Sequence, residues 1–413
     1  MTPIRRLAFL AVITGVIVLG AASAVQSVRA AGPWYVTTTG SDANACTSPA
    51  APCRSLNSAI ARAAGGDQIY IGIGVYTGLG NEVALIDKTI HLSGGWNSAF
   101  TSQTGVSTID GQLTQRGLTV NDGVVATLNR FVVQNGRAPQ GGGIYNAGAL
   151  TLTACAIQFN TTPDGGITDI GSGGGVFNTG SITILNSRIS DNYSNANLGG
   201  AGIYSTGSVT VRNSVIARNT ATSRGGGLSG LAGSIVLVNT FVHQNSAYYG
   251  GGLYMYSGTG VGIYNSTIVE NHAEWFGGGL VGDYAGGSLF NSIVYGNTAP
   301  NNPDCYWPWS GNGYNIIGVA CAFAYVPPGG FGPDPRLVHV GETYLLLPDS
   351  PAIDGGFPLG CADPDGGWLM TDQRGTARTL DGNADGPILC DLGAYEFDPA
   401  HPTGLLHLPL VIR

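Results

Sequence analysis

Short runs of β-branched and aliphatic residues alternate with turns rich in glycine and asparagine between residues 126 and 297. Each unit ends in an asparagine, and the steps between these asparagines are 25, 32, 27, 26, 26 and 26 residues. A period of this size is typical of stacked supersecondary units, and the residue types predict strands joined by tight turns. The terminal asparagines are Asn135, Asn160, Asn192, Asn219, Asn245, Asn271 and Asn297.

Aligned on its terminal asparagine, each repeat shows the same residue types in the same columns. A β-branched residue stands three positions earlier and is expected to face the core, and a second asparagine series stands six positions earlier, interrupted at Ala154. Like residues in register lie about 4.8 Å apart in a parallel coil, so the sequence predicts an all-β chain, a single-stranded right-handed parallel β-helix of about ten coils. The turn asparagines are expected to adopt the left-handed backbone conformation and to form a ladder of amide hydrogen bonds.

The repeat units themselves resemble those of known proteins. Units that end in I-x-x-N and then open with G-G-G followed by Ile or Leu resemble the short paired repeats of polymorphic outer-membrane proteins and of the wider pectin-lyase-like β-helix class. The resemblance covers residues 126–297 and implies the β-helix fold. Because scaffolds of this class carry lyases, hydrolases and adhesins, it leaves the function open.

The chain begins with a segment typical of export. Arg5 and Arg6 precede an apolar run and then small residues within residues 1–30, which predicts a cleaved secretory signal peptide. The mature chain is therefore expected to be secreted or displayed at the cell surface and to contain no membrane span.

Residues outside the repeats are interpreted as caps and attachments. An amphipathic helix at residues 55–64 is expected to cover the first coil, and the sequence around it resembles the start of secreted bacterial β-helix proteins. The predicted segments are residues 1–30 as signal peptide, 31–325 as β-helix with its N-terminal cap, 326–398 as C-terminal cap, and 399–413 as tail or sorting segment.

Three phrases near the C-terminus resemble the end of secreted bacterial β-helix proteins of the choice-of-anchor kind, in which this segment precedes variable attachment signals. They are LLLPDSPAIDGG at residues 345–356, DQRGTAR at 372–378 and CDLGAYE at 390–396. The charged residues of these phrases are expected to hold the cap together rather than to catalyse a reaction: Asp354, Asp372, Arg374, Arg378 and Glu396.

Export permits disulfides, and six of the seven cysteines fall into two close pairs and a third pair that brackets the C-terminal segment. Six cysteines allow many pairings, so pairing between neighbours is a hypothesis. The neighbouring pairs are Cys46 with Cys53, Cys305 with Cys321, and Cys361 with Cys390. Cys155 occupies the column of small residues and is interpreted as a buried side chain rather than a reactive thiol.

The composition and the columns exclude several functions. The net charge is −8 and Lys88 is the only lysine, so nucleic acid is not an expected partner. A glycoside hydrolase needs two carboxyl groups about 5 to 9.5 Å apart, whereas Asp191 and Glu270 lie three coils apart, about 14 Å by strand spacing. Asp191 is expected to form a weak solvated ion pair with Arg218, and no catalytic residue is predicted.

A divergent polysaccharide lyase acting on a uronate-containing polymer is the alternative function. Such an enzyme needs a basic side chain, usually beside carboxylates that bind calcium. The arginines on suitable coils are Arg188, Arg212, Arg218 and Arg224. No column offers three acids in successive coils, and the acidic group of Glu270, Glu274 and Asp283 is interpreted as solvated surface.

Aromatic residues recur beside the glycine triplets and form the predicted ligand-binding site. By alternation from the aliphatic column, Tyr145, Phe177, Tyr204 and Tyr254 are expected to point outward. Aromatic rings that repeat on an outer face stack on sugar rings or contact another surface, although packing on each other is the other interpretation. The predicted ligand-binding residues are Tyr248, Tyr249, Tyr254, Trp275 and Phe276.

Asp381, Asn383 and Asp385 have the spacing of the first half of a calcium-binding loop. The carboxylate that would complete the loop is missing, because Leu392 stands in its place and Asp391 comes one residue early. A hydrogen-bonded turn is the other interpretation, so calcium is a candidate and no other cofactor is expected.

Taken with the predicted export, the repeats favour a protein without its own catalysis. The predicted function is an adhesin, an envelope component or a glycan-binding scaffold, with a polysaccharide or a cell-surface molecule as the partner. The sequence does not predict the oligomeric state.

Overall fold

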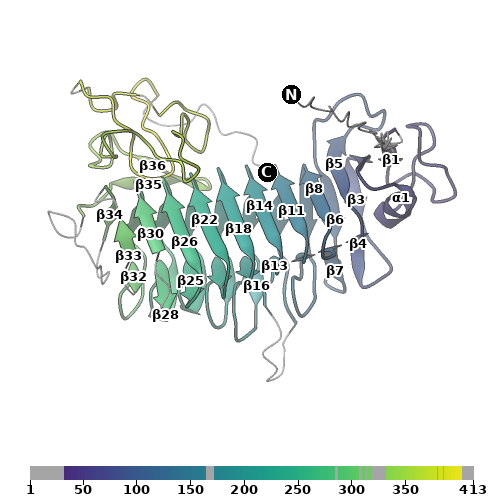
Figure 1. The fold of residues 1–413 in the computed structure, drawn as a ribbon, viewed down its shortest axis with the longest axis horizontal. Helices are drawn as coiled ribbons and strands as arrows, with labels where there is room; N and C mark the ends of the chain where they lie inside the picture. Colours follow the sequence, from purple (N-terminus) through teal and green to yellow (C-terminus); the bar gives the residue numbers. More distant parts are fainter. Residues whose placement is uncertain are drawn as a thin grey trace, which may run out of the picture.

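The structure is a computed structural model that describes residues 32–163, 172–283, 287–306, 309–311, 314–318, 332–378, 380–384 and 386–401. These residues form a right-handed parallel β-helix whose strands stack along one long shaft (Figure 1). Three parallel sheets follow the shaft, with eleven, nine and ten strands among the described residues. About nine turns therefore contribute to all three sheets, close to the ten that the sequence predicts.

The sheets are numbered here in the order of the strand counts just given, and one turn passes from the first sheet to the third and then to the second. The first sheet contains β1 (Trp34–Val36), β2 (Asp67–Gly72), β5 (Ile90–Trp96), β8 (Val125–Asn129), β11 (Ala149–Thr153), β14 (Ser181–Leu185), β18 (Ser208–Arg212), β22 (Ser234–Val238), β26 (Gly260–Tyr264), β30 (Gly287–Phe290) and β33 (Trp309–Gly311). The third sheet, which follows the next turn, contains β3 (Gly74–Tyr76), β6 (Ser107–Asp110), β9 (Phe131–Gln134), β12 (Ala156–Gln158), β15 (Arg188–Ser190), β19 (Val215–Ala217), β23 (Phe241–His243), β27 (Thr267–Val269), β31 (Ile293–Tyr295) and β34 (Ile316–Ile317).

The second sheet closes the coil before the first sheet begins again. It contains β4 (Glu82–Ile86), β7 (Arg116–Val120), β10 (Ile144–Asn146), β13 (Val176–Asn178), β17 (Ile203–Ser205), β21 (Leu228–Gly230), β25 (Leu253–Tyr256), β29 (Leu280–Asp283) and β32 (Cys305–Tyr306). A short fourth sheet lies in the loops between the third and second sheets, with β16 (Tyr193–Ser194), β20 (Thr220–Ala221), β24 (Ser246–Tyr249) and β28 (His272–Phe276).

The core is built from the aliphatic columns that the sequence predicts. The residues after the glycines pair in register from coil to coil and are fully buried: Ile144, Val176, Ile203, Leu228, Leu253 and Leu280. The β-branched column of the third sheet is equally buried from Ile157 to Val294. Each buried side chain of this size contributes roughly 1.5 to 3 kcal/mol through removal from water, and stacking repeats that gain along the shaft.

Six of the seven terminal asparagines form a buried ladder. In each step, the side-chain oxygen of one asparagine accepts hydrogen bonds from the backbone N–H and the side-chain amide of the asparagine one coil earlier; Asn219 donates both to Asn245 at 3.0 and 2.9 Å. The ladder runs from Asn160 to Asn297 and ends on the carboxylate of Asp304. It satisfies polar groups that would otherwise be buried without partners.

Asn135 is not part of this ladder, which corrects the prediction. Gln134 pairs with Gln158, so Asn160 faces Gly136 and accepts a hydrogen bond from its backbone N–H. The side chain of Asn135 instead donates to Asp110. The first repeat is therefore shifted by one residue against the others.

The left-handed residues also differ from the prediction. The six ladder asparagines are not left-handed. The residue before each of them is, with φ between 53° and 67° at Phe159, Asp191, Arg218, Gln244, Glu270 and Gly296, and Asn135, with φ 51°, holds the same corner in the first repeat. The second asparagine series does adopt this conformation, from Asn186 to Asn291. Asparagine suits those corners because its short polar side chain lowers the cost of a positive φ.

A short helix covers the first coil, as predicted. Helix α1 (Leu56–Arg62) begins at Ser55, whose hydroxyl accepts a hydrogen bond from the N–H of Ser58. Leu56 and Ile60 point into the core. None of the helices in the described part of the chain is long and apolar enough to cross a membrane.

The C-terminal segment lies along the side of the shaft, over the later coils (Figure 1). It begins with the hairpin of β35 (Leu337–Val340) and β36 (Thr343–Leu346). Apolar residues of this segment pack on the outward face of the third sheet, around Phe241 and Ile293. The second asparagine series forms its polar seam, because Asn239, Asn265 and Asn291 hydrogen-bond to it.

Two of the three predicted disulfides are present. Cys46 is bonded to Cys53 within the N-terminal cap, and Cys361 is bonded to Cys390 within the C-terminal segment. Cys321 lies outside the described residues, as do the predicted signal peptide and residues 402–413. Cys155 is a free buried thiol, and burial raises its pKa to about 12, as expected for a structural side chain.

Candidate functional site

An aromatic row crosses the last coils on the loop side of the shaft. Tyr249 of β24 pairs in register with Phe276 of β28, and their ring centroids are 4.7 Å apart. The ring of Tyr306 continues the row 4.7 Å beyond Phe276. Tyr248 stands across Tyr249 at 86°, with the centroids 4.6 Å apart. The aromatic row is defined as Tyr248, Tyr249, Trp275, Phe276 and Tyr306.

Trp275 differs from the other members of the row because its ring is open to solvent. Its exposed fraction is 51%, and it has no ring partner among the described residues. Tyr249 and Phe276 face each other along the shaft, so part of each ring face is covered by its neighbour. Trp275 therefore offers the free aromatic face that a ligand could stack on.

Tyr254, which the sequence assigns to the same site, is buried. Its exposed fraction is 4%, and its hydroxyl donates to the carboxylate of Asp283 at 3.0 Å. The guanidinium of Arg224 lies 5.5 Å from the centre of its ring. Alternation correctly turns Tyr254 away from the core, but the side chains of the adjoining loops cover it.

The other outward aromatic residues also pack on each other. The rings of Tyr145, Phe177 and Tyr204 stack at 5.4 and 5.3 Å, and Phe177 and Tyr204 are buried. Stacked rings present only their edges to solvent. This column is therefore a structural ladder, and the aromatic row near Trp275 is the part of the pattern that remains accessible.

The arginines considered as lyase bases all have other partners. Arg212 binds Asp363 and Asp365, and Arg224 packs among the rings of Tyr249, Tyr254 and Tyr256. Arg188 and Arg218 both form ion pairs with Asp191 and Glu342.

The pair of Asp191 and Arg218 is more than the isolated, solvated contact that the sequence suggests. Asp191 accepts two hydrogen bonds from Arg218, at 2.8 and 3.0 Å, and one from Arg188. Both arginines also reach Glu342 in the turn of the β35–β36 hairpin. Despite its partial burial, Asp191 has a pKa below its usual value because of the hydrogen bonds and charges of these arginines. The network thus fastens the hairpin to the shaft.

The predicted calcium site falls partly outside the described residues, because Asp385 is not among them. Asp381 accepts a hydrogen bond from the N–H of Gly386, as expected for a polar turn. The described residues contain no group of three His, Cys, Asp or Glu side chains that could hold a metal ion.

A cluster of buried charges binds the three C-terminal phrases to one another. Arg374 pairs with Asp372, and Arg378 pairs with Glu396 at 3.2 Å, all nearly excluded from solvent. Burial raises the pKa of Glu396 and of Asp391, whose oxygens accept hydrogen bonds from the backbone of Asp354 and Phe397. These residues have a structural role, as the sequence predicts, although their close packing against the shaft was not foreseen.

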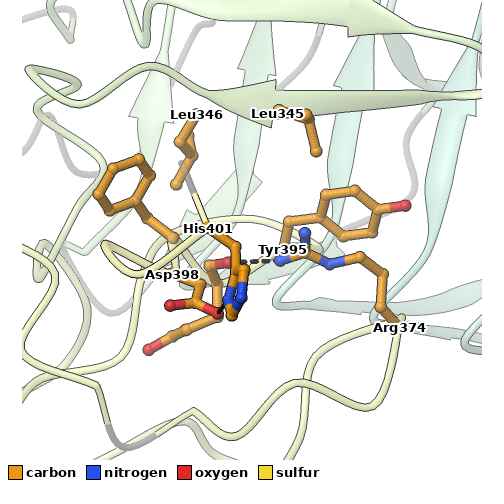
Figure 2. A pocket seen from close by; sticks show the side chains of 8 residues that line it. Leu345, Leu346, Arg374, Tyr395, Asp398 and His401 are labelled. Carbon is orange, nitrogen blue, oxygen red and sulfur yellow. Dashed lines mark hydrogen bonds and ion pairs between the residues drawn. The ribbon is translucent and has the colours of Figure 1, made fainter. Parts of the chain in front are cut away.

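A small hollow opens beside this cluster. Figure 2 shows the guanidinium of Arg374 over the ring of Tyr395, 4.1 Å from its centre, with Asp398 and His401 nearby. The hollow encloses about 10 Å³, room for one water molecule. It is too small for a sugar residue.

Comparison with solved structures supports the fold. The chain is similar to the crystal structure of pectate lyase Pel9A, with a TM-score of 0.56 and 15% identity over 88% of this chain and 96% of that one. It also aligns with a rhamnogalacturonan lyase at a TM-score of 0.31 and 12% identity, over 71% of this chain and 84% of that one. No family model matches the chain, and no curated protein matches it. The chain thus has the parallel β-helix fold seen in pectate lyase Pel9A.

Sequence reasoning did not place Tyr306 in the aromatic row, and it considered Arg224 only as a candidate lyase base. Tyr306 extends the aromatic row, yet it lies after the last regular repeat, where the period no longer predicts its register. Arg224 packs against Tyr249, but a single arginine before a glycine triplet carries no repeating signal. The sequence does not show where the loop after the last regular repeat ends and β32 begins, so it could not place Tyr306 in the row.

Proposed function

We propose that this protein is a non-catalytic β-helix scaffold that contacts a polysaccharide through the aromatic row. The observation that carries the proposal is the exposed side chain of Trp275, which is next in the chain to Phe276 of the aromatic row, whereas Tyr254 is buried. Sugar rings present C–H groups that stack on an aromatic face, and tryptophan supplies the largest such face. An adhesin or an envelope component would use the same surface.

Replacing Trp275 by alanine is expected to weaken polysaccharide binding by about tenfold, because stacking on one exposed ring contributes roughly 1 to 1.5 kcal/mol. Binding would be screened on a polysaccharide array and then measured as Kd on the polymer that binds best. The matched control is Tyr193→Ala, since Tyr193 is 39% exposed in the same fourth sheet but belongs to no ring pair in the described chain.

The array also provides the decisive negative result. If Tyr248, Tyr249, Trp275 and Phe276 are all replaced by alanine and binding to the array is retained, the aromatic row is not the contact surface. Unchanged far-ultraviolet circular dichroism would confirm that the variant is folded.

A second candidate is a divergent polysaccharide lyase, which the fold likeness to pectate lyase Pel9A favours. A lyase creates a double bond by β-elimination, so absorbance at about 235 nm would rise on a uronate polymer. We expect no rise on pectate, alginate or glycosaminoglycans, because the candidate arginines are paired or packed on rings. A steady rise on any of these polymers would place the lyase ahead of the binding scaffold.

A further inference from the structure

The β35–β36 hairpin covers a histidine on the outward face of the third sheet. His243 of β23 has an exposed fraction of 0%. In register, the equivalent residues of the earlier coils are Asp110, Gln134, Gln158, Ser190 and Ala217. The side chains of this column are partly exposed in the earlier coils and fully buried from Ser190 onward, where the hairpin begins to cover the sheet. The hairpin therefore decides the surroundings of His243.

The contacts of His243 require a neutral imidazole. Its Nε2 lies 3.1 Å from the backbone oxygen of Glu342, and because a carbonyl oxygen only accepts, Nε2 must carry the proton. Its buried Nδ1 has no hydrogen-bond partner among the described residues. A second proton on Nδ1 would therefore have no acceptor while the hairpin is closed.

Charged and titratable groups face this histidine from several elements. Arg218 and Arg188 bring positive charge from the two preceding coils, and the ring of His339 lies 5.9 Å away on β35. Glu342 in the hairpin turn and Asp191 between the arginines offset part of this charge. On the following coil, Glu270 accepts a hydrogen bond from the hydroxyl of Tyr344, whose ring packs against His243. Burial first and these positive charges second lower the pKa of His243 to about 3.

We propose that the β35–β36 hairpin is a flap that acid opens: a proton on His243 releases the hairpin from the shaft while the rest of the C-terminal segment stays attached. The imidazole binds this proton in water once the hairpin has lifted. Opening takes the ring of Tyr344 away from Phe241, whereas Tyr395 of the attached part of the segment keeps its contact with that ring.

The buried charge cluster keeps the remainder of the segment in place. The raised pKa of Glu396 and Asp391 means that the folded chain binds their protons more tightly than the unfolded chain does. Their contribution to stability is present in acid and is lost as the pH rises through the folded pKa. Acid thus weakens the hairpin contact and strengthens the contact formed by the cluster, so the two parts of the segment respond in opposite directions.

The test is hydrogen exchange of the intact protein at about pH 7.5 and about pH 5, corrected for intrinsic exchange rates. With a pKa of about 3 in the closed form and about 6.5 in the open form, opening becomes about 30-fold more favourable at pH 5. Protection of the β35 and β36 amides is expected to fall by that factor, with about one decade lost per pH unit below 6.5. Amides of β5 and β8, which lie several coils before the first residue that contacts the hairpin, should keep their protection.

Two variants assign the effect to His243. His243→Gln keeps an N–H donor for Glu342 but cannot take up a proton, so protection of the hairpin should be equal at both pH values. His339→Gln removes the exposed histidine and should retain most of the acid response. Wild-type protection that does not change with pH would overturn the proposal, and so would a full acid response in His243→Gln.

Discussion

Asn245→Ala is expected to lower the free energy of unfolding by about 4 kcal/mol. The side chain of Asn245 donates to Asn271, Ile216 and His243, and it accepts two hydrogen bonds from Asn219. All of these groups are buried, so each donor or acceptor left unpaired costs roughly 1 to 3 kcal/mol. Alanine fits the backbone here because the left-handed residue is Gln244, not Asn245. Urea unfolding would measure the change.

The control for this prediction is Asn135→Gly, which removes an asparagine that the sequence placed in the same ladder. Asn135 makes one side-chain hydrogen bond, to Asp110, and glycine tolerates its φ of 51°. The expected loss is below about 1 kcal/mol. Equal losses in the two variants would show that the ladder contributes no more than an ordinary surface amide.

Arg378→Met is expected to weaken the attachment of the C-terminal segment by about 3 to 5 kcal/mol. The guanidinium joins Glu396, Gly393 and Asp391 of the segment to Asn239 of the shaft, with N···O distances between 2.8 and 3.3 Å. Methionine fills the space but leaves a buried carboxylate without its cation, which is the costly half of breaking a buried pair. Hydrogen exchange of residues 372–378 and 390–397 would measure the loss of docking.

Arg336→Ala provides the contrast, because Arg336 pairs with Asp349 while both side chains are about half exposed. A pair of this kind contributes roughly 0 to 1 kcal/mol, so protection of the C-terminal segment should be almost unchanged. If Arg378→Met also leaves protection unchanged, the segment is held by its apolar contacts with the third sheet rather than by the buried cation.

Most of the fold could be predicted from the sequence because a coil repeats its chemistry every turn. Ile203 and Leu228 are neighbours across the sheet and occupy the same place in their repeats, so periodicity alone pairs them. Periodicity misleads at Asn135, which stands one residue before the ladder position and occupies the left-handed corner instead. The candidate site shows the same limit: Trp275 and Phe276 were found from their repeat positions, whereas burial of Tyr254 depends on loops that do not repeat.

The sequence by itself determined the shaft, its asparagine ladder and the direction in which each repeating side chain points, because these follow from local residue types at a regular spacing. Only the tertiary structure decided how the C-terminal segment lies on the third sheet. Arg378 and Asn239 are 139 residues apart and belong to no common pattern, so their contact depends on how the two surfaces fit together. For the same physical reason the surroundings of His243, and hence its response to acid, could not be predicted before the hairpin was seen to cover it.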